Sequence, residues 1–345
     1  MRRLALILLL LVVWAAFGFG VNRFLESRKS NLTEARSTLA PPQESPAFSL
    51  PGVIYVSQAG HLYRFDAGKF TDLKLPAATG AWMEPSPASG GHLLAVARAA
   101  DYSDVYLVDG TTGTVVQKLT SNATRTKFVE LNAWSYFPHL ATDGKTVVFN
   151  YDGPKTGTSY EVDFAVWAGP LGGKLATTQW TTPNGYTGGD VAPVPLPGGG
   201  VLYAKYALDS SSKVLSRIAM VARPGATPVY LTAAADDCNE PAVSPDGTQL
   251  AVVCTSDTQT AKLELIPLVK GVPGTPKVLV DACLCASPSW SPDGGSLLYL
   301  APADATGHFQ LWWLNHATAV TPAPANLVTT HLDLDATSPP AWVAA

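Results

Sequence analysis

The stretch Ser287-Pro-Ser-Trp-Ser-Pro-Asp-Gly294 decides the fold, because its second half occurs earlier in the chain at Ser244-Pro-Asp-Gly247. Ser-Pro-Asp-Gly is a tight-turn sequence: proline presets φ at the first corner, aspartate bonds the backbone ahead of it, and glycine accepts a positive φ. An apolar run follows each copy within a few residues. Each copy therefore predicts the bend of a β-hairpin.

Weaker copies of this pattern can be aligned on a proline that precedes each turn. These anchor prolines lie 47 to 55 residues apart, a spacing typical of a four-stranded propeller blade. Strand-like apolar runs fill the intervals, and 29 glycines and 28 prolines interrupt any long helix. Six blades are predicted, from the anchors Pro85, Pro138, Pro193, Pro241, Pro288 and Pro340.

The two ends of the repeat region each supply part of one blade. Only an innermost strand follows Pro340, whereas three strands are expected at 53–56, 61–65 and 70–73 with no such strand before them. We expect residues 340–344 to pair beside residues 53–57, which removes exposed sheet edges. The predicted fold class is all-β: a six-bladed β-propeller over residues 51–345, closed by its C-terminal strand and preceded by one hydrophobic N-terminal helix.

The repeat resembles that of a known family. The pattern Pro-x-Trp-Ser-Pro-Asp-Gly-x-x-Leu is intact at 288–297 and has valine for tryptophan at 241–250. It is similar to the PD40 (WD40-like) repeat of TolB-type six-bladed propellers. The resemblance implies the fold and not the role of TolB, which carries an α/β domain for which residues 22–50 are too few. Other members of this broad family are binding scaffolds, sensor domains or the propellers of serine peptidases.

The N-terminal region predicts export. Arg2 and Arg3 precede an uncharged, mostly apolar stretch at residues 4–21, so residues 1–21 are a signal anchor or a signal peptide. The length of the stretch favours an uncleaved anchor. Residues 22–50, rich in Ser, Thr and Pro, predict a flexible tether, with a short helix over 22–35 as the alternative. The expected location is extracytoplasmic, periplasmic or at the cell surface, anchored to the membrane or secreted after cleavage.

The four cysteines lie in two neighbouring repeats. Hairpin pairing places Cys238 and Cys254 at one end of a blade, so a disulfide between them is expected in an oxidising compartment. A bond from Cys238 to Cys285, between blades, stays open, because both lie three residues before an anchor proline. Free buried thiols are a further alternative. A metal at Cys283 and Cys285 is disfavoured, because no histidine lies nearby in sequence.

Charge and motifs exclude several functions. The net charge of −4 and pI of about 5.8 offer no general basic surface for nucleic acid. The sequence contains no Gly-x-Ser-x-Gly, no His-Glu-x-x-His and no phosphate-binding glycine-rich loop, and its six histidines are scattered. We therefore predict no catalytic residue and conclude that the chain is not an enzyme.

The candidate site is the mouth of the central channel, where loops lead into the innermost strands. Glu84 and Glu240 hold the same repeat position three blades apart, so we expect them to face each other across the axis. Such carboxylates could hold Ca²⁺ or a basic peptide segment, and no other cofactor is expected. The alternative is that they accept hydrogen bonds from neighbouring blade backbones. The full candidate set is Glu84, Asp190, Asp236, Asp237 and Glu240.

The resulting functional hypothesis is a membrane-tethered extracytoplasmic propeller. It would serve as a protein-interaction scaffold or as an accessory subunit of an envelope complex. The rivals are a small-ligand or cation receptor that uses the channel mouth and an enzyme with an unrecognised site. The fold alone does not decide between them.

Overall fold

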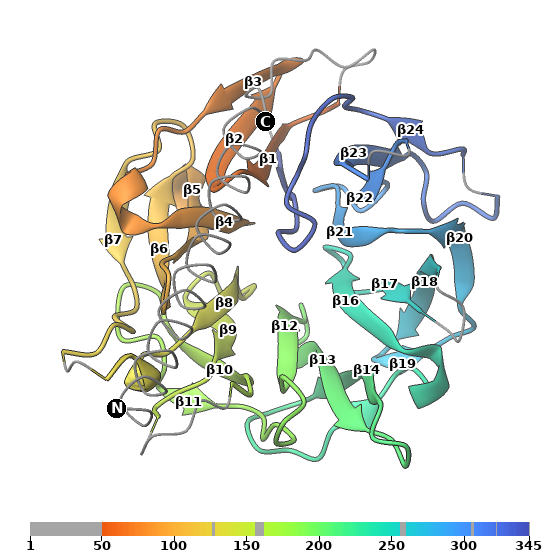
Figure 1. Cartoon of the computed structure of the whole chain (residues 1–345). Helices are drawn as coiled ribbons and strands as arrows, with labels where there is room; N and C mark the ends of the chain where they lie inside the picture. Colours follow the sequence, from red (N-terminus) through yellow and green to blue (C-terminus); the bar gives the residue numbers. More distant parts are fainter. Residues whose placement is uncertain are drawn as a thin grey trace, which may run out of the picture. The chain divides into compact units, whose positions relative to one another are not determined.

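Six antiparallel sheets surround a common axis in the computed structural model (Figure 1). The structure describes residues 50–125, 128–155, 162–255, 260–304, 307–321 and 323–344. The expected membrane segment at 1–21, and the tether at 22–50 except for Leu50, lie outside these residues. Within the described ranges, no helix has the length and apolar character needed to cross a membrane.

Each blade has an innermost strand beside the axis, followed outward by its partners. Blade 1 contains β25 (Ala341–Val343), β1 (Val53–Gln58), β2 (His61–Asp66) and β3 (Lys69–Asp72). Blade 2 contains β4 (Ala81–Pro87), β5 (His92–Arg98), β6 (Ser103–Asp109) and β7 (Val115–Lys118). Blade 3 contains β8 (Ser135–Leu140), β9 (Thr146–Tyr151), β10 (Ala165–Pro170) and β11 (Thr178–Gln179).

The other three blades follow the same order. Blade 4 contains β12 (Asp190–Pro195), β13 (Val201–Leu208), β14 (Val214–Val221) and β15 (Val229–Tyr230). In blade 5, β18 pairs with both β19 and β20; its strands are β16 (Cys238–Val243), β17 (Gln249–Cys254), β18 (Ala261–Val269), β19 (Val272–Pro273) and β20 (Lys277–Cys283). Blade 6 contains β21 (Ala286–Trp290), β22 (Leu297–Pro302), β23 (Phe309–Leu314) and β24 (Asn326–Leu327). In the loops that the structure describes, there are four short 3₁₀ turns: η1 (Ala77–Thr79), η2 (Ser89–Gly91), η3 (Val129–Leu131) and η4 (Ala234–Asp236).

The Ser-Pro-Asp-Gly sequences form the hairpin turns after the innermost strands of blades 5 and 6. The carboxylate of Asp246 accepts the N–H of Thr248 at 3.0 Å, and Gly247 has φ 74°. Asp293 accepts the N–H of Gly295 in the same way, also at 3.0 Å. We call the side of the ring with these turns the turn face. The opposite side, where loops lead into the innermost strands, is the loop face.

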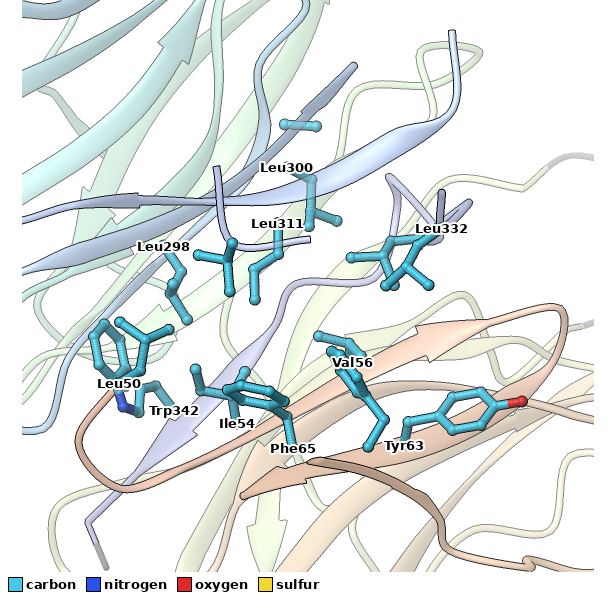
Figure 2. Packing of buried hydrophobic residues seen from close by; sticks show 14 residues of the cluster. Leu50, Ile54, Val56, Tyr63, Phe65, Leu298, Leu300, Leu311, Leu332 and Trp342 are labelled. Carbon is cyan, nitrogen blue, oxygen red and sulfur yellow. The ribbon is translucent and has the colours of Figure 1, made fainter. Parts of the chain in front are cut away.

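Blade 1 combines strands from both ends of the described chain. β25 pairs antiparallel with β1, with Ile54 opposite Trp342, and the indole N–H of Trp342 donates to the carbonyl of Pro51 at 2.6 Å. Apolar side chains of blades 1 and 6 pack together here, as Figure 2 shows. Because β25 runs toward the turn face, Leu50 and the start of β1 lie on that face. Trp290 and Trp342 are both buried between blades, as their shared repeat position predicts.

Candidate functional site

A β-bulge interrupts each innermost strand of blades 2 to 6 at its anchor proline. The strand register shifts there in all five sheets. The proline lacks an N–H group, so it leaves no unsatisfied donor. The residue before it adopts the left-handed conformation and keeps an N–H that points out of the ladder and needs an acceptor. These residues, with φ between 49° and 53°, are Glu84, Phe137, Ala192, Glu240 and Ser287.

Two of the candidate carboxylates supply that acceptor to the next blade. Oε2 of Glu84 in blade 2 accepts the N–H of Phe137 in blade 3 at 2.5 Å. Oε2 of Glu240 in blade 5 accepts the N–H of Ser287 in blade 6, also at 2.5 Å. Both contacts are charge-assisted when the carboxyl is ionised. The structure therefore gives Glu84 and Glu240 the backbone-tying role that the sequence left as the alternative.

Other polar side chains connect further pairs of blades at the same level. Oγ of Ser338 accepts the N–H of Glu84 at 2.7 Å, and Oδ1 of Asn150 accepts the N–H of Ala192 at 2.8 Å. The hydroxyl of Ser287 donates to the carbonyl of Ala336 at 2.7 Å. The sequence did not reveal these partners. The signal for them is the residue before each repeat proline, whose N–H must find an acceptor.

The two glutamates form the same kind of hydrogen bond, but their surroundings differ. Glu84 is 4% exposed, and its burial, reinforced by the charge of Asp335, raises its pKa well above the usual value. Glu240 lines the axial channel, and burial raises its pKa to about 7, against the opposing effect of the Ser287 N–H. Near neutral pH, Glu240 therefore exchanges a proton while it holds blade 6.

The remaining three candidate carboxylates each form a hydrogen bond or an ion pair with a nearby residue. Asp190 is buried and forms an ion pair with Lys205 at 2.9 Å, and burial raises its pKa. Asp237 accepts both the N–H and the hydroxyl of Ser216, at 2.8 and 3.0 Å. Asp236 is exposed and accepts the N–H of Ala233 at 3.1 Å. Within the described ranges, no group of three His, Cys, Asp or Glu side chains is arranged to hold a metal ion.

The axial channel is a cavity of about 370 Å³ lined by the innermost strands of all six blades. Of the five candidate carboxylates, only Glu240 is part of its wall. The expected acidic opening is therefore replaced by a mainly apolar wall. Proline, alanine and valine residues make up most of it, together with four aromatic residues, Phe137, Tyr206, Trp290 and Trp342. Four anchor prolines contribute to the same wall: Pro85, Pro241, Pro288 and Pro340.

A serine and a histidine meet in this wall. Oγ of Ser86 lies 3.2 Å from Nδ1 of His139, each one residue after an anchor proline. A hydroxyl within reach of an imidazole is the arrangement that nucleophilic catalysis uses. Burial lowers the pKa of His139 to about 4, so the imidazole is neutral at pH 7 but a weak base. The contact is a further side-chain link between blades 2 and 3.

All four cysteines form disulfides on the loop face. Cys238 is bonded to Cys254, which lies directly opposite it on β17. Cys283 is bonded to Cys285, a pairing that was not among the sequence alternatives. The inter-blade bond from Cys238 to Cys285 is thereby excluded. No free cysteine remains among these four.

Comparison with known proteins identifies the fold. No known family model matches the chain, and no curated protein matches it significantly. TolB from Acinetobacter baumannii superposes with a TM-score of 0.63 at 17% identity, over 85% of this chain and 67% of its own. A putative TolB from Agrobacterium tumefaciens gives a TM-score of 0.59 at 14% identity, over 84% of this chain and 93% of its own.

A third similar structure corrects one conclusion from the sequence. A Mycobacterium tuberculosis puromycin-hydrolyzing peptidase superposes with a TM-score of 0.51 at 18% identity, over 85% of this chain and 46% of its own. The same propeller fold thus forms part of an enzyme chain. The conclusion that this chain is not an enzyme was therefore wrong, because it was drawn only from the absence of catalytic motifs. At these identities the comparisons carry the fold and not the activity. This chain has the fold of the TolB-like six-bladed β-propellers.

Proposed function

We propose that this chain is a protein-interaction propeller whose axial channel receives an extended, mainly apolar segment of a partner protein. The observation that carries the proposal is the wall of the channel, in which prolines and four aromatic residues surround a cavity of about 370 Å³. Apolar walls with a few placed polar groups are typical of binding pockets. Proline and aromatic side chains also suit an extended peptide, because they offer rigid apolar surface.

The polar groups of the wall favour a ligand that donates hydrogen bonds. Oδ1 of Asn239 is buried in this wall and accepts no hydrogen bond from any described residue. A buried acceptor without a donor costs stability, so a bound donor is favoured there. The N–H groups of an extended peptide are such donors. Glu84, by contrast, is already engaged by Phe137 and lies outside the wall.

The compartment and the anchoring are part of the proposal. The two disulfides favour an oxidising compartment, and the apolar stretch at residues 4–21 favours export and a membrane tether. The chain enters the propeller at Leu50, on the turn face. The partner would then belong to a membrane or envelope complex that reaches the propeller within the length of residues 22–50.

We further propose that pairing of β25 with β1 holds the ring closed. Removal of residues 339–345 takes away Trp342, which is buried against blade 6, and exposes the inner edge of β1. The truncated protein should aggregate on size-exclusion chromatography. A monomer with unchanged melting would contradict this closure.

The binding proposal can be tested without knowing the partner. Peptides are selected from a displayed random library on the purified propeller, and each is measured on two variants that fill the channel from different blades, Ser289→Trp and Val194→Trp. Val269→Trp, at a position that is 69% exposed and outside the channel, is the matched control. We expect apolar peptides that bind the wild type and the control but neither channel variant. Selection of only channel-independent peptides would contradict the proposal.

A small apolar ligand with a donor group is the second candidate. The cavity volume falls within the range of small-molecule sites, which supports it. The same variants distinguish a peptide from a small ligand. If the small ligand is correct, no selected peptide binds the channel, whereas a small apolar compound with a donor group raises the melting temperature of the wild type and not of the channel variants. A Ca²⁺ site at the channel mouth is a weaker candidate, since the described carboxylates already have partners.

A further inference from the structure

The two disulfides of blade 5 differ in burial. Cys238 and Cys254 are 1% and 4% exposed and lie in the apolar core between blades 4 and 5. Cys283 is half-buried, Cys285 is 6% exposed, and Leu284 between them is 59% exposed. One bond is thus sealed inside the blade. The other lies near the surface of the loop face, and its Cys283 end is only half-buried.

The two bonds also differ in how much of the chain they constrain. Cys238 and Cys254 are 16 residues apart in sequence, whereas Cys283 and Cys285 are two apart. The stabilisation that a disulfide provides grows with the length of the loop it closes, because it acts mainly on the unfolded chain. The Cys283–Cys285 bond is therefore expected to contribute the smaller part of the stability. Its reduction should leave the propeller folded.

The backbone beside Cys283 forms a β-bulge, because the register of β20 against β18 shifts between Val280 and Cys283. Ala282, directly before it, has φ 50°, a left-handed conformation that is unfavourable for a residue with a Cβ. Its N–H donates to Oδ1 of Asp281 at 2.9 Å. The bulge leaves Asp281 and Ala282 exposed beside Cys283 on the loop face.

From these observations we propose that Cys283 and Cys285 form a thiol–disulfide exchange site for low-molecular-weight thiols, whereas Cys238–Cys254 is structural. The thiolate of a first thiol attacks Sγ of Cys283; the bond to Cys285 breaks, and Cys285 leaves as a thiolate. A second thiol then attacks the sulfur of the first thiol in the mixed disulfide and releases Cys283. Two thiols are oxidised to one disulfide, and the cysteine pair gains two electrons and two protons.

The position of the two sulfurs selects the attacked atom and the size of the co-reactant. Cys285 is 6% exposed in the apolar cluster between blades 5 and 6, whereas Cys283 packs against this cluster and is only half-buried, so a nucleophile reaches Cys283 first. Cys283 is itself recessed, which favours a small thiol. Exposed disulfides are generally the labile ones, and buried ones resist reduction. The site is independent of the peptide-binding proposal.

The main test is a redox titration of the folded protein. The oxidised full-length protein is equilibrated at neutral pH with glutathione buffers of increasing reducing strength, and free thiols are alkylated and located by mass spectrometry. We expect Cys283 and Cys285 to become alkylated while Cys238 and Cys254 stay bonded until guanidinium unfolds the chain. Four free thiols at the start, reduction of both pairs together, or reduction only on unfolding would each overturn the proposal.

Single variants test the order of attack. The Cys285→Ala variant leaves Cys283 free to form a mixed disulfide with oxidised glutathione, and the Cys283→Ala variant does the same for Cys285. We expect the first reaction to be at least about tenfold faster, because Cys285 is buried. Equal or reversed rates would contradict attack at Cys283. The titration of the wild type decides the proposal even if a variant fails to fold.

Discussion

The joint between blades 2 and 3 and the joint between blades 5 and 6 use the same bond in different surroundings. In each, a glutamate before an anchor proline accepts the N–H of the equivalent residue in the next blade at 2.5 Å. In the first joint, Glu84 is 4% exposed and lies outside the channel wall, to which this joint contributes Ser86 and His139. In the second joint, Glu240 itself lines the channel, and the indole N–H of Trp290 donates to the carbonyl of Ala242 at 3.0 Å.

The position of each glutamate in its repeat determines its hydrogen bond to the next blade. Its burial determines whether the carboxyl can also contact a ligand in the channel. Glu84 has no access to the channel and serves only the joint. Glu240 serves its joint and also presents a titratable group, of pKa about 7, to whatever enters the channel. The difference can be measured.

The largest effect is expected when each glutamate is shortened. Glu84→Ala leaves the N–H of Phe137 without an acceptor and creates a buried cavity, so the free energy of unfolding should fall by about 4 kcal/mol. Glu240→Ala should cost only about 1 kcal/mol, because water in the channel can accept the N–H of Ser287. Guanidinium unfolding measures both. Glu84→Gln and Glu240→Gln keep an acceptor oxygen and serve as controls, and equal costs for the two alanine variants would contradict the difference between the joints.

A smaller effect should appear in the pH dependence of stability. The pKa of Glu240 is raised by folding to about 7, so the folded state binds the proton more tightly and the free energy of unfolding falls as pH rises from about 4.5 to 7. Because the group borders the channel, we expect a fall of about 2 kcal/mol. Glu240→Gln should remove it. Identical pH profiles for this variant and the wild type would contradict the assigned shift.

His139, in the other joint, should show the opposite slope. Its pKa is lowered by burial to about 4, so the unfolded state binds more protons and stability rises with pH between about 4 and 6.5. His139→Gln removes this rise. Below pH 6.5 the rise from His139 opposes the falls from Glu240 and Glu84, whose pKa values are both raised, so the His139→Gln variant should show a steeper fall than the wild type. The measurement is the difference in unfolding free energy between each variant and the wild type across this range.

The smallest effect is expected from calcium. Glu84 and Glu240 are already bonded to backbone N–H groups, and Asp190 is paired with Lys205. Millimolar Ca²⁺ should therefore leave the melting temperature of the wild type unchanged within error. A clear rise that Glu84→Gln combined with Glu240→Gln abolishes would restore the carboxylates as cation ligands.

The sequence predicted the blades better than the site, for physical reasons. Turn chemistry and proline spacing are local, so Ser-Pro-Asp-Gly and the anchor prolines identify the six blades without tertiary information. The site depends on which way side chains turn at a β-bulge. Glu84 and Glu240 match in sequence position, yet one is sealed and the other lines the channel. In the sequence, the prolines of the apolar wall could be recognised only as markers of the repeats. That they meet around one axis follows only from the closed ring.

The central claim, that the apolar wall of the channel and not its carboxylates binds the partner, is tested most directly by one set of dissociation constants. A peptide selected on the wild type is measured on Ser289→Trp, on Val269→Trp and on the double variant Glu84→Gln/Glu240→Gln. We predict that Ser289→Trp weakens binding by at least about tenfold, or about 1.4 kcal/mol, while the other two bind within a few-fold of the wild type. Lost binding in the double glutamine variant together with retained binding in Ser289→Trp would contradict the claim.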